Sequence, residues 1–243
     1  MGLCSLSEEE WLQPDPDLAA RAAAFAADPY GVQHTRYTDE PGRELAAMLG
    51  VEGGLLDAAK AHHEDMCLLK KFADEDFYRL IGTAVAYPTD WHPKEKMGLP
   101  LTAMHEPIQG YAEQLASGVD HFMTKLKPGK IFGRCNWFIA PIPELRWIAD
   151  EPAAVAYRHV TAGNAGETLF VRSERQTLRR LPETGTILFT IGVYVAPLSD
   201  LSRENVALLS HAMQDLLQGE GDRRGAPHYA SYLIGYAAKQ SRN

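Results

Sequence analysis

The sequence of 243 residues lacks any apolar run that approaches the ~20 residues needed for a membrane-spanning helix. The segment from Met1 to Glu10 is acidic, whereas a secretory signal peptide begins with a basic stretch followed by an apolar one. Cysteine is scarce as well: Cys4, Cys67 and Cys135 are an odd number at unrelated spacings, which predicts neither a disulfide framework nor a thiolate zinc site. These features predict a cytoplasmic protein with no membrane-bound part.

The sequence also lacks an excess of basic residues. Its 24 Lys and Arg residues against 32 Asp and Glu residues give a formal net charge of −8 at pH 7. Because nucleic-acid binding needs a basic surface that neutralises phosphates, this balance predicts no nucleic-acid partner. The common catalytic motifs are missing too, since there is no glycine-rich phosphate loop, no Gly-x-Ser-x-Gly and no His-Glu-x-x-His.

What is present is an ordinary globular composition, 45% hydrophobic and 23% charged, in a chain long enough for one well-packed domain. Prolines interrupt residues 1–50, which we expect to form an irregular and partly helical extension ahead of a single domain over residues 51–243. Apolar periodicity and composition predict helices over 18–27, 55–69, 111–126, 205–217 and 229–239. Runs of β-branched and aromatic residues predict strands over 77–87, 131–139, 168–172 and 186–195. This order of elements predicts an α+β fold with a mainly antiparallel sheet.

Three groups of residues stand out by their chemistry. One is the pair His62 and His63, which on a helix would point about 100° apart and could not readily share a metal ion. Another is His105, in a loop rich in proline and glycine. The third is the polar run 172–182, whose residues 173–181 are rich in helix formers and predict a short helix or turn.

The polar run 172–182, followed by 184–191, resembles the signature of the haem-dependent oxidative N-demethylase family. Four further segments resemble that family in the expected order, and together the matches span about residues 65–198. They are Asp65-Met66-Cys67-Leu68-Leu69, Pro88-Thr89-Asp90-Trp91 with Lys94-Glu95-Lys96-Met97-Gly98, Met104-His105-Glu106-Pro107-Ile108-Gln109-Gly110-Tyr111, and Arg134-Cys135-Asn136-Trp137. The resemblance implies a PAS-like fold that binds haem, an antiparallel sheet with flanking helices, and oxygen-dependent N-demethylation of a secondary amine with electrons from a separate reductase.

On this resemblance we expect His105 to be the axial ligand of a heme b iron, because imidazole is a common protein ligand of haem. Cys135 is the alternative ligand, since a thiolate favours cleavage of the oxygen–oxygen bond. We expect Glu174 and Arg134 to be catalytic. A carboxylate beside an arginine can relay protons to oxygen or hold a dialkylammonium substrate. The alternative for this pair is a structural salt bridge between neighbouring strands.

Arginine suits haem propionates because its planar guanidinium can bind a carboxylate through two hydrogen bonds. We therefore expect Arg172, Arg175 and Arg179, which would share one face of a helix, to supply one or two propionate contacts. Trp137 is expected to line the pocket of the cofactor or substrate, with core packing as its alternative role.

The leading functional hypothesis is therefore a haem-dependent, oxygen-using oxidoreductase of monooxygenase type, acting on an amine or an N-substituted, amino-acid-like molecule. An alternative from another class is a haem-based gas or redox sensor, which a PAS-like fold also supports. A third hypothesis sets the resemblance aside and makes the chain a cofactor-free hydrolase or binding domain. The sequence leaves self-association into a homo-oligomer open.

Overall fold

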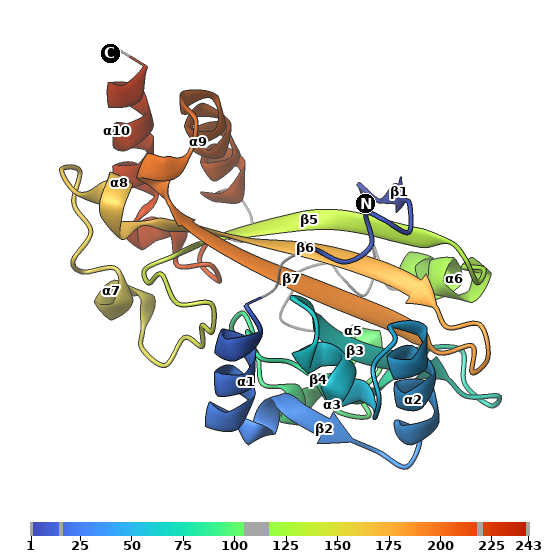
Figure 1. The fold of residues 1–243 in the computed structure, drawn as a ribbon. Helices are drawn as coiled ribbons and strands as arrows, with labels where there is room; N and C mark the ends of the chain where they lie inside the picture. The colour runs from blue at the N-terminus through green and yellow to red at the C-terminus, as the bar shows by residue number, and fades with distance from the viewer. Residues whose placement is uncertain (1, 15–16, 105–116, 218–220, 242–243) are drawn as a thin grey trace. The chain divides into compact units, whose positions relative to one another are not determined.

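The computed structural model describes residues 2–14, 17–104, 117–217 and 221–241 (Figure 1). These residues form a seven-stranded open sheet in the order β1-β5-β6-β7-β3-β4-β2. The strands are β1 (Cys4–Leu6), β2 (Val32–His34), β3 (Asp65–Lys71), β4 (Tyr78–Ala84), β5 (Ile131–Ala140), β6 (Phe170–Arg180) and β7 (Ile187–Pro197). Antiparallel pairing joins β1 to β5, β2 to β4, and β3 to both β4 and β7. The predicted α+β class, with an antiparallel sheet and flanking helices, is confirmed.

The chain divides into two compact units. The first contains residues 1–136 and 174–193, and the second contains residues 137–173 and 194–243. Strands β5, β6 and β7 therefore contribute residues to both units.

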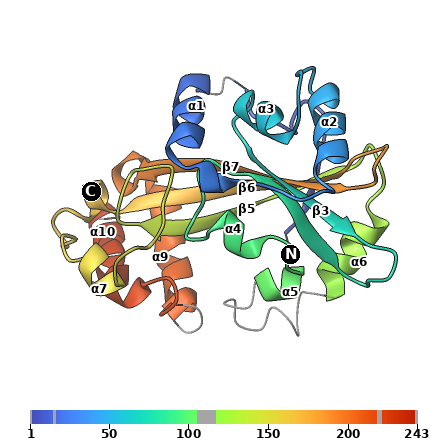
Figure 2. The same ribbon diagram turned by 90° about the horizontal axis from the view of Figure 1, so that it is seen from below.

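In the first unit, helices cover both faces of the sheet (Figure 2). One face carries α1 (Leu18–Ala27), α2 (Asp39–Met48) and α3 (Leu55–Lys60), and the other carries α4 (Pro93–Lys96), α5 (Leu101–Met104) and α6 (Ser117–Lys125). Against this second face lies a cluster that we call the α5–α6 core. Its buried members are Cys67, Leu69, Tyr78, Leu80, Val85, Leu101, Met123, Leu126 and Ile187.

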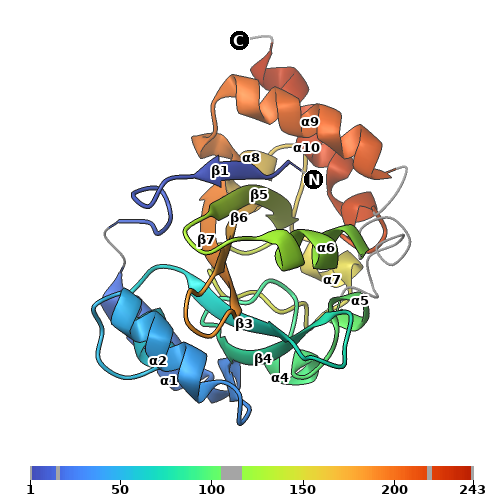
Figure 3. The same ribbon diagram turned by 90° about the vertical axis from the view of Figure 1, so that its right-hand side faces the viewer.

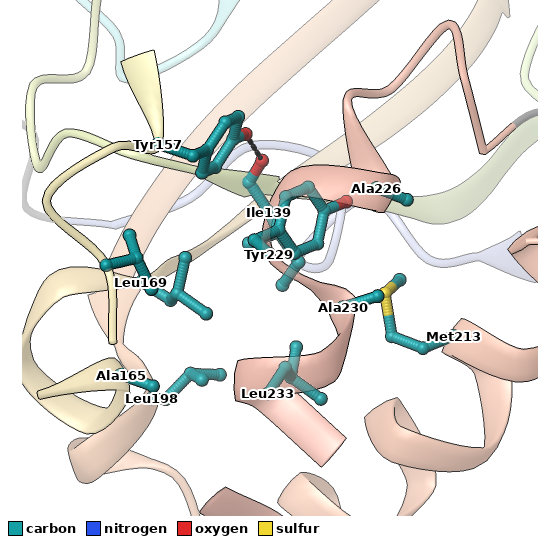
Figure 4. Close-up of a cluster of buried hydrophobic side chains, with 11 residues drawn as sticks. Ile139, Tyr157, Ala165, Leu169, Leu198, Met213, Ala226, Tyr229, Ala230 and Leu233 are labelled. Atoms are coloured by element: carbon teal, nitrogen blue, oxygen red, sulfur yellow. Dashed lines mark hydrogen bonds between the residues drawn. The ribbon is translucent and has the colours of Figure 1, made fainter. Parts of the chain in front are cut away.

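The second unit packs α7 (Ala153–Ala156), α8 (Ala165–Thr168), α9 (Arg203–Leu217) and α10 (Ala230–Gln240) around its own core (Figure 4). In this core the Tyr157 and Tyr229 rings lie with their centroids 4.7 Å apart, and the Tyr157 hydroxyl donates a hydrogen bond of 2.7 Å to the Ile139 carbonyl. Within the described residues of both units, every helix falls short of the length and apolar character that a bilayer-crossing segment requires.

Two of the predicted elements are wrong, and both are strands that sequence reasoning took for helix. The helix predicted over 55–69 ends at Lys60, and Asp65–Lys71 forms β3. This strand pairs with β4 on one edge and with β7 on the other, and Met66, Cys67 and Leu68 are all buried. Its apolar residues are therefore consecutive and lack the apolar–polar alternation of a half-exposed strand.

The second correction concerns residues 173–181, which form most of β6 rather than a helix or turn. β6 lies between β5 and β7, so sheet pairing overrides the helix propensity of its side chains. As a consequence, Arg172, Arg175 and Arg179 do not share a face. Side chains alternate along a strand, which places Arg175 and Arg179 on one face and Arg172 on the other.

Candidate functional site

The two faces of β6 carry different polar groups. On one face Glu174 and Gln176 precede Leu178, which packs against the α5–α6 core. On the opposite face lie Arg175 and Arg179. The candidate site is the first of these faces, because Leu178 on it packs against the same core as Leu101 and Met104 of α5.

A chain of hydrogen bonds on this face links β6 to β5. The Gln176 Nε2 group donates to Glu174 Oε2 at 2.8 Å, and Arg134 Nε donates to Gln176 Oε1, also at 2.8 Å. We call Arg134, Gln176 and Glu174 the polar relay. Glu174 and Gln176 are 6% and 7% exposed, whereas Arg134 is exposed to solvent. The relay therefore joins a buried carboxylate to a cation at the surface.

The arrangement of the relay defines what it can do. The predicted residues Arg134 and Glu174 are brought together, with the amide of Gln176 between them. The neutral Gln176 amide orients the Glu174 carboxylate, which is the acid–base group of the relay. Because Glu174 is buried, its carboxylate also offers a strong ionic partner to a cationic ligand that reaches this face.

The α5–α6 core fixes the position of Met104, the residue that precedes His105. Leu101 of α5 is buried in that core, and Met104, the last residue of α5, packs against it. His105 is the next residue along the chain and lies outside the described residues. The predicted iron ligand thus follows an element anchored on the same sheet face as the polar relay.

Arg175 and Arg179 hold the segment 7–13, which we call the N-terminal strap. Arg175 donates to the backbone carbonyls of Glu10 and Trp11, the latter at 2.9 Å. Arg179 forms an ion pair with Glu8, and its guanidinium stacks on the Trp11 ring at 4.2 Å from the centroid. Both guanidinium groups are therefore bonded to the strap, on the face of β6 opposite Glu174.

Arg172 and Trp137 belong to the second unit. The Arg172 side chain is fully buried, and its Nη1 donates to the Glu144 carbonyl at 3.2 Å. Trp137 is half-buried against the core of the second unit, and its carbonyl accepts a hydrogen bond of 2.9 Å from Arg224 Nη1. Each of the two residues thus has a local structural partner.

The other candidate ligands also have defined surroundings. His62 Nδ1 lies 2.9 Å from the Ala58 carbonyl, and His63 Nε2 lies 3.2 Å from the Val193 carbonyl. Cys135 is exposed and, by strand alternation, points to the face opposite its neighbour Arg134. Among the described residues no three His, Cys, Asp or Glu side chains gather as a metal site.

Glu64 lies beneath the N-terminal strap and is only 1% exposed. Its Oε1 accepts a hydrogen bond of 2.8 Å from the Gln13 amide, while Oε2 is buried with no hydrogen-bond partner among the described residues. Burial away from water raises the pKa of the Glu64 carboxyl, an effect that the Gln13 amide and the charges of His63 and Arg175 offset in part.

This shift leads to a testable pH dependence. A carboxyl whose pKa is higher in the folded than in the unfolded state holds its proton more tightly when folded, so its contribution to stability falls as pH rises above about 4.3. Glu64→Gln, which cannot ionise, should therefore be more stable than the wild type at pH 8, with the difference shrinking toward pH 4. Urea denaturation across this range measures it. The exposed Glu52→Gln serves as control, and a Glu64→Gln protein less stable at pH 8 would contradict the prediction.

The chain also matches a known protein family. A family model described as haem-dependent oxidative N-demethylase, alpha subunit-like, matches residues 33–234, most of the chain. The chain belongs to this family. The resemblance predicted from the sequence is thereby confirmed, and the match includes the polar relay and the loop that carries His105.

In this member of the haem-dependent oxidative N-demethylase, alpha subunit-like family, sequence reasoning missed Gln176, the residue whose amide links Glu174 to Arg134. The residue stands two positions after Glu174, a spacing that places both side chains on one face of a strand. Because residues 173–181 were expected to form a short helix or turn, the two-residue spacing of Glu174 and Gln176 was not recognised as a strand pattern. A strand assignment would have pointed to Gln176 from the sequence alone.

Proposed function

We propose that this protein is a haem-dependent oxidoreductase that removes an N-methyl group from a secondary amine or an N-methylated, amino-acid-like molecule. Its family supports the haem-dependent oxidative chemistry. The observation that carries the proposal is the polar relay, a buried carboxylate on the sheet face from which α5 leads into His105. The substrate class follows from that carboxylate, which would pair with the cationic nitrogen of an alkylammonium.

The described residues fit a haem on this face through their apolar side chains. Half-buried apolar side chains, among them Trp91, Met97 and Phe132, pack around the α5–α6 core and offer the apolar contacts that a porphyrin requires. A single imidazole, that of His105, would bind the iron, which we take to be that of heme b. Arg175 and Arg179 do not fit as propionate partners, because both are bonded to the N-terminal strap.

A bound haem would supply the iron on which dioxygen is reduced and the N-methyl group is oxidised. Glu174 would hold the substrate nitrogen and release or take up a proton, and Gln176 would keep its carboxylate oriented. Arg134, exposed at the end of the relay, would hold the Gln176 amide in place. The release of formaldehyde requires electrons from outside the chain, for which a separate reductase remains our prediction. Three other expectations also stay predictions: a PAS-like fold for residues 51–243, an extension formed by residues 1–50, and a homo-oligomer.

The test is spectroscopic and then catalytic. Purified protein supplied with haem should give a Soret band, and the reduced protein should consume oxygen only when a suitable secondary amine or N-methylated amino acid is present, with formaldehyde released. A generic reductase can deliver the electrons. The absence of a Soret band would overturn the proposal. Reversible oxygen binding without loss of any substrate tested would favour the sensor hypothesis instead.

His105 can be tested separately. His105→Ala should abolish or greatly weaken haem incorporation while leaving the far-ultraviolet circular dichroism unchanged, because the imidazole is the proposed ligand. The matched control is His92→Ala, which removes an exposed histidine from the residues before α4. A His105→Ala protein that keeps the wild-type Soret spectrum would refute the ligand assignment and direct the search to His63, His121 and Cys135.

A further inference from the structure

Two of the three cysteines lie on neighbouring strands. Strand β1 lies beside β5 (Figure 3). In their antiparallel pairing Cys4 stands opposite Gly133, so Cys135 is two residues beyond the partner of Cys4. Both cysteines are exposed to solvent. Paired residues point to the same side of a sheet, and so do residues two apart on one strand, so the two thiols share a face.

A neighbouring pair shows which way side chains on β1 lean. Leu6 stands opposite Ile131, yet a Cβ built on Gly133 would lie only 2.6 Å from Leu6 Cδ1. A side chain of β1 therefore reaches over the residue two positions beyond its own partner. Cys4 occupies the equivalent place with respect to Cys135, so the register and the lean of the strand bring the Cys4 sulfur toward Cys135.

The distance between the strands makes a bond between these sulfurs feasible. Diagonal neighbours across an antiparallel pair have Cα atoms about 7–8 Å apart, whereas disulfides join Cα atoms that are usually about 4.4–6.8 Å apart. A shift of roughly 1–2 Å closes this gap. β1 can make such a shift, because it is three residues long and lies at the edge of the sheet, with β5 as its neighbour.

The third cysteine takes no part in this chemistry. Cys67 lies on the central strand β3 and is 3% exposed in the α5–α6 core. Burial, with a smaller contribution from the charge of Asp65, raises the pKa of the Cys67 thiol and keeps it protonated. Reactivity toward oxidants is therefore confined to the exposed pair.

We propose that Cys4 and Cys135 form a site of reversible oxidation, in which a hydroperoxide converts the two thiols to an intrachain disulfide. One thiolate attacks the peroxide, the oxygen–oxygen bond breaks, and a sulfenic acid forms with release of water or an alcohol. The second thiol then displaces the sulfenic oxygen as water, and the sulfur–sulfur bond forms. The thiols are oxidised, the peroxide is reduced, and the product ties β1 covalently to β5. Reduction by an external thiol restores both cysteines.

Dibromobimane tests the proximity of the two thiols, because it becomes strongly fluorescent only after it has alkylated two thiols within bridging distance. The folded wild type and the Cys67→Ser variant should both give this fluorescence. Cys4→Ser and Cys135→Ser should each lose it. Wild-type fluorescence no higher than that of Cys135→Ser would overturn the proposal.

Peroxide treatment tests the bond itself. After mild hydrogen peroxide and blocking of free thiols, mass spectrometry should find the peptides of Cys4 and Cys135 joined, with the mass of a disulfide, and separated again by dithiothreitol. Cys67→Ser should behave like the wild type. Oxidation of the two cysteines to separate sulfinic acids, or disulfides only between different chains, would contradict the proposed intrachain pair.

Discussion

Replacing Arg21 with alanine is expected to lower the free energy of unfolding by about 3–5 kcal/mol, the range found when one partner of a buried ion pair is removed. Arg21 is 1% exposed and forms an ion pair of 3.2 Å with Asp65, which is equally buried. Its guanidinium also donates to the carbonyls of Ala59, His63 and Glu64 at 2.7–2.9 Å.

The size of this effect follows from what the alanine variant leaves behind. Asp65 would remain buried, and among the described residues the amides of Ala86 and Tyr87 would be the donors left to its carboxylate, at 2.7 and 3.0 Å. The carbonyls of Ala59, His63 and Glu64 would each lose a charged hydrogen-bond donor. A buried acceptor left without a donor costs about 1–3 kcal/mol, and the cost is smaller where water can enter the space left by the side chain. The rings of Phe25 and Tyr87 would lose the guanidinium that lies 5.3 and 5.5 Å from their centroids.

Urea denaturation at pH 7, followed by circular dichroism, measures the change. Arg43→Ala is the matched control, because Arg43 is an exposed arginine within a helix of the same unit and its loss should change stability by at most about 0.5 kcal/mol. Arg21→Lys, which keeps the charge but not the planar donor geometry, should be intermediate. Equal stability of Arg21→Ala and Arg43→Ala would show that the buried ion pair contributes little.

The regular elements with strong local signals were predictable from the sequence. The alanine-rich run 18–27 forms α1 over the predicted range, and the Asp17 side chain accepts a hydrogen bond from the Ala20 amide at its start. The apolar runs that became β5 and β7 were also found, because their β-branched and aromatic residues leave little alternative. In these segments local preference and sheet pairing agree.

Strand β3 and the part of β6 beyond Arg172 could not be predicted, for opposite reasons. In β3 both faces are buried, so Asp65–Lys71 shows no alternation to distinguish it from a helix. In β6 the residues are mostly polar, and their partners lie far away in the chain: Arg175 bonds to Glu10 and Trp11, and Arg179 to Glu8. Those contacts depend on the position of the N-terminal strap, which cannot be predicted from the sequence of β6 alone.

The same limit applies to the chemistry. The sequence pointed to Arg134 and Glu174 through a resemblance, but their connection through Gln176 depends on the pairing of β5 with β6. Likewise, the unrelated spacings of Cys4 and Cys135 predicted no disulfide, and only the register of β1 against β5 brings them close. Register between distant strands is set by tertiary packing, so residues that meet across strands are hidden from a reading of single segments.

Replacing Glu174 with glutamine is expected to reduce the rate of the proposed N-demethylation by ~10²–10⁴-fold, the usual cost of losing an acid–base group. Glutamine keeps the size of the side chain and can still accept from Gln176 Nε2, at 2.8 Å in the wild type, but it cannot ionise. Haem content, judged by the Soret band, should therefore stay at the wild-type level while formaldehyde release falls. The expected loss lies in proton transfer and in the binding of a cationic nitrogen.

Three further variants make this prediction specific. Glu183→Gln changes an exposed glutamate in the turn between β6 and β7 and should leave the rate unchanged. Gln176→Leu keeps a side chain of similar size but cuts the link between Glu174 and Arg134, so it should lower the rate, though less than Glu174→Gln does. Arg134→Lys should act in the same direction, because lysine has no counterpart of the Nε group that bonds to Gln176. A Glu174→Gln protein that turns over at the wild-type rate would reduce the polar relay to a structural link between β5 and β6, and the proton donor would then have to be another group that reaches the haem.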